Sequence, residues 1–178
     1  MKNILGSLTL ITVLLFAFSA IAVDKVVVIP LNSSDPGPHY YTLPGAVFVG
    51  DNSAGHNTDG TIGNVGAGNY YFAPVILPNQ AKLTEFVVWA KNSSTSVPDD
   101  VSLMRYDRAA AAPTVMATAT VPCWGGGICT GDGTFQKLVA PSITPDVIDN
   151  IDYSYAVVIH SGDGLLQVSA IRIAYTTK

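Results

Sequence analysis

A long run near the C-terminus, in which large apolar side chains return at every second position, constrains the fold most. Residues 153–159 place Tyr, Val or Ile at alternate positions, which is the period of an extended strand with one apolar face. A Ser-Gly-Asp-Gly turn at 161–164 separates this run from a second one, which includes Val168, Ile171, Ile173 and Tyr175. We therefore predict that the two runs form a β-hairpin.

Short runs of the same kind recur along the rest of the chain, and loops rich in Gly, Pro, Asn and Ser separate them. They predict further strands at 26–29, 40–43, 46–49, 70–77, 82–91, 101–106, 114–121 and 134–139. No run predicts an amphipathic helix, because Pro113 ends the alanine run at 109–112. About eight to ten strands without helices predict an all-β fold, a β-sandwich of jelly-roll type.

The run at 82–91 predicts a central strand, because both of its faces are mostly apolar in the middle. We expect Phe86 and Val88 to point into the core and Trp89 to lie near a second packing surface.

The N-terminus has the pattern of an export signal. Lys2 precedes an apolar segment at 4–18, and Ala-Ile-Ala at 20–22 provides a small-x-small cleavage site. A retained membrane anchor is the alternative, but the apolar segment is short and contains Gly, Ser and Thr. We therefore predict a signal peptide at 1–22 and a single domain at 23–178. The protein would be secreted or periplasmic, with no stable membrane anchor.

The composition of the chain excludes a nucleic-acid partner. The net charge is −4, and the nine basic residues are scattered singly along the sequence, so no basic patch is evident. Charged residues make up 12% of the chain, a low fraction for a soluble domain. Ser, Thr, Asn and Gly supply the polarity instead, as is typical of an extracytoplasmic β-protein.

Two cysteines bracket a short loop that contains Trp124 and three glycines. In an exported chain, Cys123 and Cys129 are expected to form a disulfide, because the glycines let the backbone fold back. A redox or metal pair is the alternative, but the spacing is not Cys-x-x-Cys. The chain-entropy argument gives a loop of this size a stabilisation of about 2–2.5 kcal/mol.

Several segments carry a family resemblance: 73–78 (APVILP), 85–91 (EFVVWAK), 148–155 (IDNIDYSY) and 171–176 (IRIAYT). Together they resemble a group of small uncharacterised secreted bacterial proteins, over a stretch from Tyr70 to Thr177. The resemblance implies a bacterial origin and a β-sandwich fold. It implies no active site.

The function predicted from these features is binding without catalysis. The leading hypothesis is a structural or protein-interaction module that contacts a protein partner or a second copy of itself, because strands such as 83–90 are apolar on both faces. The alternative is a carbohydrate-binding module that uses Trp124, Trp89 or Tyr106. An aromatic strip flanked by Asn, Asp or Gln would favour carbohydrate, whereas a large apolar patch would favour assembly.

Catalysis and metal binding have weaker signals. A hydrolase would need His56 or His160 beside a serine and a carboxylate, and no nucleophile-elbow motif identifies such a serine. The sequence predicts no cofactor, and calcium is the one metal ion that it allows. Its first candidate site is Asp51, Asn52 and Asp59 in the long loop at 50–69. The pairs Asp99 and Asp100, and Asp132 and Asp163, are further candidate ligands. The alternative for all of these residues is that they are solvated turn residues.

Overall fold

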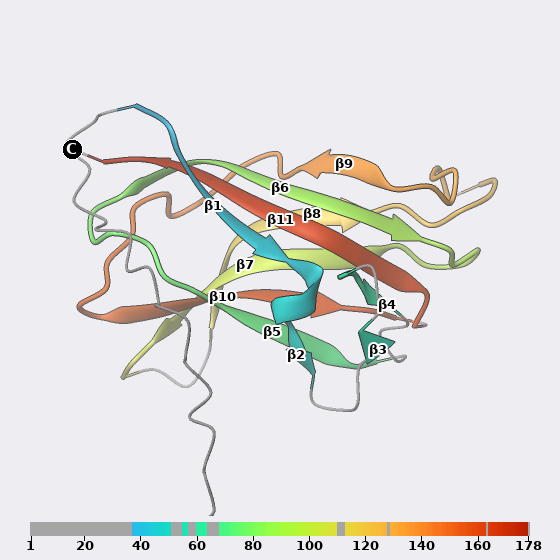
Figure 1. Cartoon of the computed structure of the whole chain (residues 1–178), viewed down its shortest axis with the longest axis horizontal. Coiled ribbons are helices and arrows are strands. Elements are labelled where there is room, and N and C mark those ends of the chain that lie inside the picture. The colour runs from blue at the N-terminus through green and yellow to red at the C-terminus, as the bar shows by residue number, and fades with distance from the viewer. Residues whose placement is uncertain are drawn as a thin grey trace, which may run out of the picture. The chain divides into compact units, whose positions relative to one another are not determined.

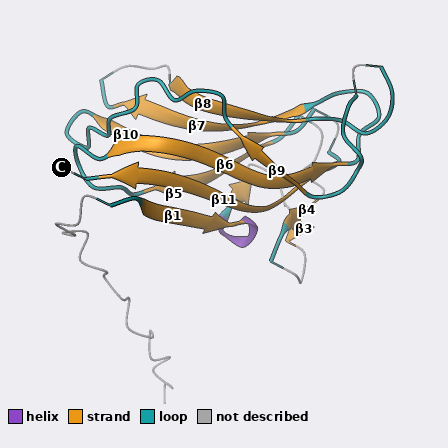
Figure 2. Cartoon of the chain, turned by 90° about the horizontal axis from the view of Figure 1, so that it is seen from above, coloured by secondary structure: helices purple, strands orange, loops and turns teal. Residues whose placement is uncertain are grey.

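The computed structural model describes residues 37–50, 55–56, 60–63, 68–109, 113–127, 129–162 and 164–177, with the backbone alone at 55–56. One short 3-10 helix, η1 (Gly45–Val47), follows the first strand (Figure 2). The predicted signal peptide at 1–22 and the predicted strand at 26–29 lie outside the described residues. The strands are β1 (His39–Pro44), β2 (Val49–Gly50), β3 (Gly55–His56), β4 (Ile62–Gly63), β5 (Tyr70–Val75), β6 (Lys82–Asn92), β7 (Asp99–Asp107), β8 (Thr114–Val121), β9 (Gln136–Val139), β10 (Tyr153–His160) and β11 (Leu166–Thr176).

The strands form two antiparallel sheets that pack face to face (Figure 1). Sheet A has the order β3-β4-β11-β6-β9, and β1 also pairs with β11. Sheet B has the order β2-β5-β10-β7-β8. From β5 onward the chain passes repeatedly between the sheets, which is the connectivity of a jelly roll. The predicted all-β sandwich is confirmed.

The core lies between the sheets and is built by the strands that alternate most strictly. On β6, Phe86 and Val88 are fully buried, as predicted, and face Ile171 and Ile173 of β11 along the same inner surface. Sheet B contributes Leu103, Val157 and Ile159, which are also fully buried. Burial of these side chains supplies the main driving force that holds the two sheets together.

The predicted hairpin of residues 153–175 is wrong. β10 pairs with β5 and β7 in sheet B, whereas β11 pairs with β1, β4 and β6 in sheet A. The turn between them therefore carries the chain from one sheet to the other. Each strand has an apolar face, but these faces meet across the core and not within one sheet. Alternation predicted the two strands correctly and gave no information about their partners.

The connection between β10 and β11 is held by a buried carboxylate. Asp99, at the start of β7, accepts a hydrogen bond of 2.7 Å from the backbone N–H of Gly162. It also accepts one of 3.4 Å from the hydroxyl of Ser161. Both Asp99 and Ser161 are buried, so this contact fixes the start of the crossover.

The disulfide predicted between Cys123 and Cys129 is present, with an S–S distance of 2.01 Å. Both cysteines are buried in the loop between β8 and β9. The backbone N–H of Trp124, within this loop, donates to the carbonyl of Ser94 at 2.6 Å. Among the described residues there is no helix with the length and hydropathy that a membrane crossing requires.

Candidate functional site

The outer face of sheet B carries the most prominent group of exposed aromatic side chains. Along β5, burial alternates strictly: Tyr71, Ala73 and Val75 point into the core. Tyr70 and Phe72 point outward and remain 45% and 41% exposed. A strand in a half-buried sheet is expected to be polar on its outer face, so two exposed rings at adjacent outward positions call for an explanation.

The strand register extends this pair into rows that cross the sheet. Tyr70 lies beside His160 of β10, which lies beside Asp100 of β7, which lies beside Thr120 of β8. The next row runs in the same way through Phe72, Val158, Ser102 and Thr118. Each row thus begins with an aromatic ring on β5 and ends with hydroxyl groups on β8 or β7.

The rings at one end of these rows form a strip. The ring centroids of Tyr70 and His160 are 4.6 Å apart with an interplanar angle of 30°, and those of Tyr70 and Phe72 are 6.5 Å apart at 28°. Such offset, nearly parallel rings are favourable to one another and hold each other in place. We call these three neighbouring rings, His160, Tyr70 and Phe72, the aromatic strip.

The polar groups beside the aromatic strip are held in place by mutual hydrogen bonds. The hydroxyl of Thr120 donates to a carboxylate oxygen of Asp100 at 2.8 Å. The hydroxyls of Ser102 and Thr118 lie 2.9 Å apart and share a hydrogen bond. A carboxylate has more lone pairs than one threonine uses, so Asp100 keeps acceptor capacity for a ligand.

A hollow of about 320 Å³ lies over this face, next to the aromatic strip. Burial raises the pKa of the Tyr106 phenol, whose hydroxyl contacts the sulfur of Met104 at 3.8 Å. The phenol is therefore neutral at physiological pH and can act as a hydrogen-bond donor. The residues that line the hollow are apolar or aromatic: Tyr70, Phe72, Met104, Tyr106, Pro113 and Val158.

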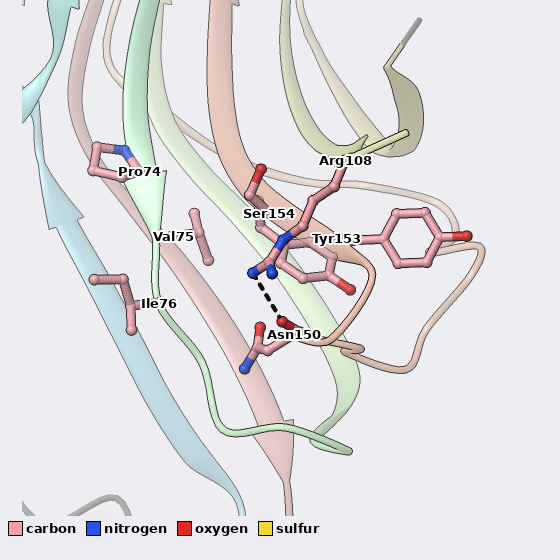
Figure 3. Close-up of a pocket in the computed structure, with 8 residues that line it drawn as sticks. Pro74, Val75, Ile76, Arg108, Asn150, Tyr153 and Ser154 are labelled. Atoms are coloured by element: carbon pink, nitrogen blue, oxygen red, sulfur yellow. Dashed lines mark hydrogen bonds between the residues drawn. The ribbon is translucent and has the colours of Figure 1, made fainter. Parts of the chain in front are cut away.

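A second hollow of about 290 Å³ adjoins the same face at the far end of β5 (Figure 3). Pro74 and Ser154, which both line it, occupy outward positions of β5 and β10. The Arg108 side chain reaches across it, and its guanidinium donates to the Asn150 carbonyl at 3.1 Å (Figure 3). The outer face of sheet B therefore continues from the aromatic strip to a cationic group.

Of the residues that the sequence suggested for binding, only Tyr106 lies on this face. Trp89 is half-buried on the outer face of sheet A, where the guanidinium of Arg172 lies 5.4 Å from its ring centroid. Trp124 is 52% exposed in the disulfide loop. The structure thus places the three residues on different surfaces, and their roles in binding stay predictions.

Sequence reasoning did not single out Tyr70 or Phe72, and it named His160 only for a hydrolase and Asp100 only for calcium. The signal for the first two was available, because large rings at 70 and 72 alternate with positions that the same strand buries. His160 and Asp100 could not be added from sequence, because their positions beside Tyr70 depend on the pairing of β5, β10 and β7.

The suggested calcium ligands Asp51, Asn52 and Asp59 lie outside the described residues. Within the described part of the chain, no group of three or more His, Cys, Asp or Glu side chains is placed to hold a metal ion. Asp132 instead accepts hydrogen bonds from Thr134 and Gln136, and these lower the pKa of its carboxyl to about 2.

The two histidines whose side chains are described make ring contacts in different sheets. His160 stacks on Tyr70 in sheet B, and His39 lies 5.3 Å from the Tyr175 ring in sheet A. His56 lies in β3, where only the backbone is described. The structure therefore places the His160 ring against the Tyr70 ring.

No protein-family model matches this chain, and neither does any curated protein. Solved structures of carbohydrate-binding modules do resemble it. A xylan-binding module, CBM15, aligns with a TM-score of 0.50 at 14% identity, over 80% of this chain and 99% of that one. The C-terminal CBM6 of LamC, a marine laminarinase from Zobellia galactanivorans, aligns with a TM-score of 0.49 at 14% identity, over 78% and 100%. A β-1,3-glucan-binding CBM6 from Bacillus halodurans aligns at 0.45 and 12% identity, over 74% and 93%. At this level of identity, the likeness to the xylan-binding module shows a shared β-sandwich fold.

Proposed function

We propose that this chain is a non-catalytic carbohydrate-binding module that holds a polysaccharide on the outer face of sheet B. The observation that carries the proposal is the aromatic strip of His160, Tyr70 and Phe72 beside the hydrogen-bonded pair of Asp100 and Thr120. A pyranose ring has an apolar face that packs on aromatic rings, and its hydroxyls need polar partners at the edge. Both kinds of contact lie next to each other on this face.

The size and lining of the hollow support a sugar ligand. Its volume of about 320 Å³ lies in the range of small-molecule sites, and rings form much of its wall. Tyr106 adds a neutral phenol that can donate to a sugar oxygen. The second hollow, with Arg108 and Asn150, extends the surface along the sheet and so accommodates a chain of several sugars.

Two further observations are consistent with this function. The fold resembles that of a xylan-binding module, so xylan is the first ligand to test. The disulfide, together with the predicted signal peptide, fits an exported protein that would meet polysaccharides outside the cell. Trp89 and Trp124 lie on other surfaces and take no part in the proposed site.

The proposal is tested by affinity electrophoresis in gels that contain soluble xylan, with neutral β-glucans as further ligands. We expect xylan to retard the wild-type protein, and Phe72→Ala and Tyr106→Ala to weaken binding by about tenfold each, since an aromatic contact contributes about 1–1.5 kcal/mol. Tyr106→Phe separates the role of the ring from that of the hydroxyl.

Trp124→Ala is the matched control, because it removes an exposed aromatic ring that belongs neither to the aromatic strip nor to the lining of the hollow. It should bind xylan as the wild type does. If none of the neutral polysaccharides retards the wild type, or if Phe72→Ala and Tyr106→Ala bind unchanged, the proposal is wrong.

Protein interaction or self-association is the second candidate, and exposed valines on the same face favour it. Val49, paired with Phe72, is 71% exposed, and Val115 is exposed beside the edge of the sheet. Size-exclusion chromatography with light scattering distinguishes the two functions. A defined dimer that Val49→Lys dissociates would favour assembly, whereas a monomer would leave the face free for a ligand. No observation on the described residues adds support to the hydrolase alternative.

A further inference from the structure

The outer face of sheet A, opposite the proposed carbohydrate site, combines cations with aromatic rings. Strand pairing places Lys137 of β9 beside Trp89 of β6, and Trp89 beside Ala170 of β11. Two positions along β6, Lys91 lies with its ammonium 5.1 Å from the ring centroid of Phe135. Arg172 of β11 occupies the adjacent outward row.

The charges on this face do not cancel. Arg172 pairs with Glu85 at 2.8 Å. Lys91 and Lys137, in contrast, form no ion pair within the described part of the chain. Lys82, at the end of β6, is paired with Asp146 at 3.5 Å. The two unpaired ammonium groups therefore give this face a positive charge, although the chain as a whole has a net charge of −4.

Aromatic rings lie beside these cations on the outer face of sheet A. The guanidinium of Arg172 lies 5.0 Å from the Tyr40 ring centroid and 5.4 Å from that of Trp89, so it separates two aromatic surfaces. Tyr40 and Phe135 are exposed, whereas Trp89 is half-buried. The exposed rings of Tyr40 and Phe135 are therefore the ones that a ligand on this face can contact most fully.

We propose that this face is a second binding site and that its ligand is an anionic polysaccharide with a carboxylate on its sugar rings. The ammonium groups of Lys91 and Lys137 bind the carboxylates, and Phe135 and Tyr40 contact the pyranose faces. A repeating polyanion meets both lysines at once, which strengthens an attraction that is weak for each exposed charge alone. The inference rests on the charges and rings of the outer face of sheet A, so it does not depend on the proposed carbohydrate site on sheet B.

The test is affinity electrophoresis of the full chain in gels that contain polygalacturonate, with dextran as the neutral reference. We expect retardation by polygalacturonate that weakens as salt rises from about 0.05 M to about 0.5 M, because salt screens exposed charges. The double variant Lys91→Gln/Lys137→Gln should bind about tenfold more weakly. Lys82→Gln, which removes an exposed lysine that is already paired with Asp146, should bind as the wild type does.

The outcomes separate the two sites. Phe72→Ala should bind xylan about tenfold more weakly and keep its polygalacturonate binding, whereas the double lysine variant should keep xylan binding and bind polygalacturonate about tenfold more weakly. The inference is overturned if polygalacturonate does not retard the wild type at low salt, or if the double variant binds as well as Lys82→Gln. It is also overturned if phosphatidylglycerol vesicles bind through the same lysines while polygalacturonate does not, since the ligand would then be a membrane.

Discussion

Gly45 occupies a position where the backbone of two other strands leaves no room for a side chain. A Cβ atom at Gly45 would collide with the carbonyl oxygen of Val168 and would lie 2.6 Å from the backbone nitrogen of Ile62. Both contacts are with backbone atoms, which cannot move aside without disturbing the pairing of β11 with β4. The absence of a Cβ therefore lets η1 pack against sheet A.

Gly45→Ala is expected to lower the free energy of unfolding by about 2–4 kcal/mol, because overpacking against backbone forces strands apart. Gly126→Ala is the control, since nothing lies within 4 Å of a Cβ built there. We expect that variant to stay within about 0.5 kcal/mol of the wild type. Urea denaturation followed by circular dichroism measures both. Equal stability of the two variants would show that η1 can shift without cost.

At the level of strands, the sequence predicted most positions correctly, but the one pairing that it predicted is wrong. The predicted strand at 46–49 is also wrong in its first half, since Gly45–Val47 form η1 and β2 begins at Val49. Phe86 and Val88 reached the core as predicted, because the pattern of β6 depends on its own residues and their burial. The partner of β10 depends on Tyr70–Val75 and Asp99–Asp107, which lie far away in the sequence. A local pattern cannot encode such a choice, and this is why the hairpin prediction failed.

The same limit applies to the candidate site. Tyr106 could be proposed from its residue type alone, but the face on which it lies is assembled from β5, β10, β7 and β8. Trp89 and Trp124 were predicted as ligand-binding residues, and the structure places neither of them in the aromatic strip or in the lining of the hollow. The rows of neighbours that make the site are a property of strand order, which composition and periodicity do not determine.

The crossover between β10 and β11 offers a test at the level of elements. Asp99 is buried and binds the N–H of Gly162, so Asp99→Ala leaves a buried donor without its partner. We expect a loss of about 2–3 kcal/mol in the free energy of unfolding, the usual cost of removing a hydrogen bond to a charged group. Chemical denaturation measures it.

Asp100→Ala is the matched control for that substitution. Asp100 is the next residue on β7, but its side chain is exposed on the outer face and bound to Thr120. Its removal should cost less than about 1 kcal/mol. A similar loss in both variants would mean that the Asp99 contact does not hold the crossover.

At the scale of the whole molecule, one core joins the two sheets, while the proposed ligand contacts lie outside it. Side chains from both sheets, such as Phe86 and Leu103, belong to the same buried cluster. Neither sheet can keep its apolar face covered when the other unfolds, so we expect unfolding in a single cooperative transition. The outer face of sheet B exists as a surface only while four of its strands remain paired, so a ligand bound there stabilises the whole fold.

A xylan-derived oligosaccharide should therefore raise the unfolding midpoint of the wild type. At a ligand concentration one hundred times the Kd, linkage adds about 2.7 kcal/mol to the free energy of unfolding. Phe72→Ala removes an exposed ring, so its midpoint without ligand should stay close to that of the wild type. With a Kd about tenfold weaker, the same ligand concentration should add only about 1.4 kcal/mol to its free energy of unfolding. Differential scanning calorimetry measures both quantities. Two separate transitions would contradict the single core, and an undiminished shift in Phe72→Ala would place the ligand on another surface.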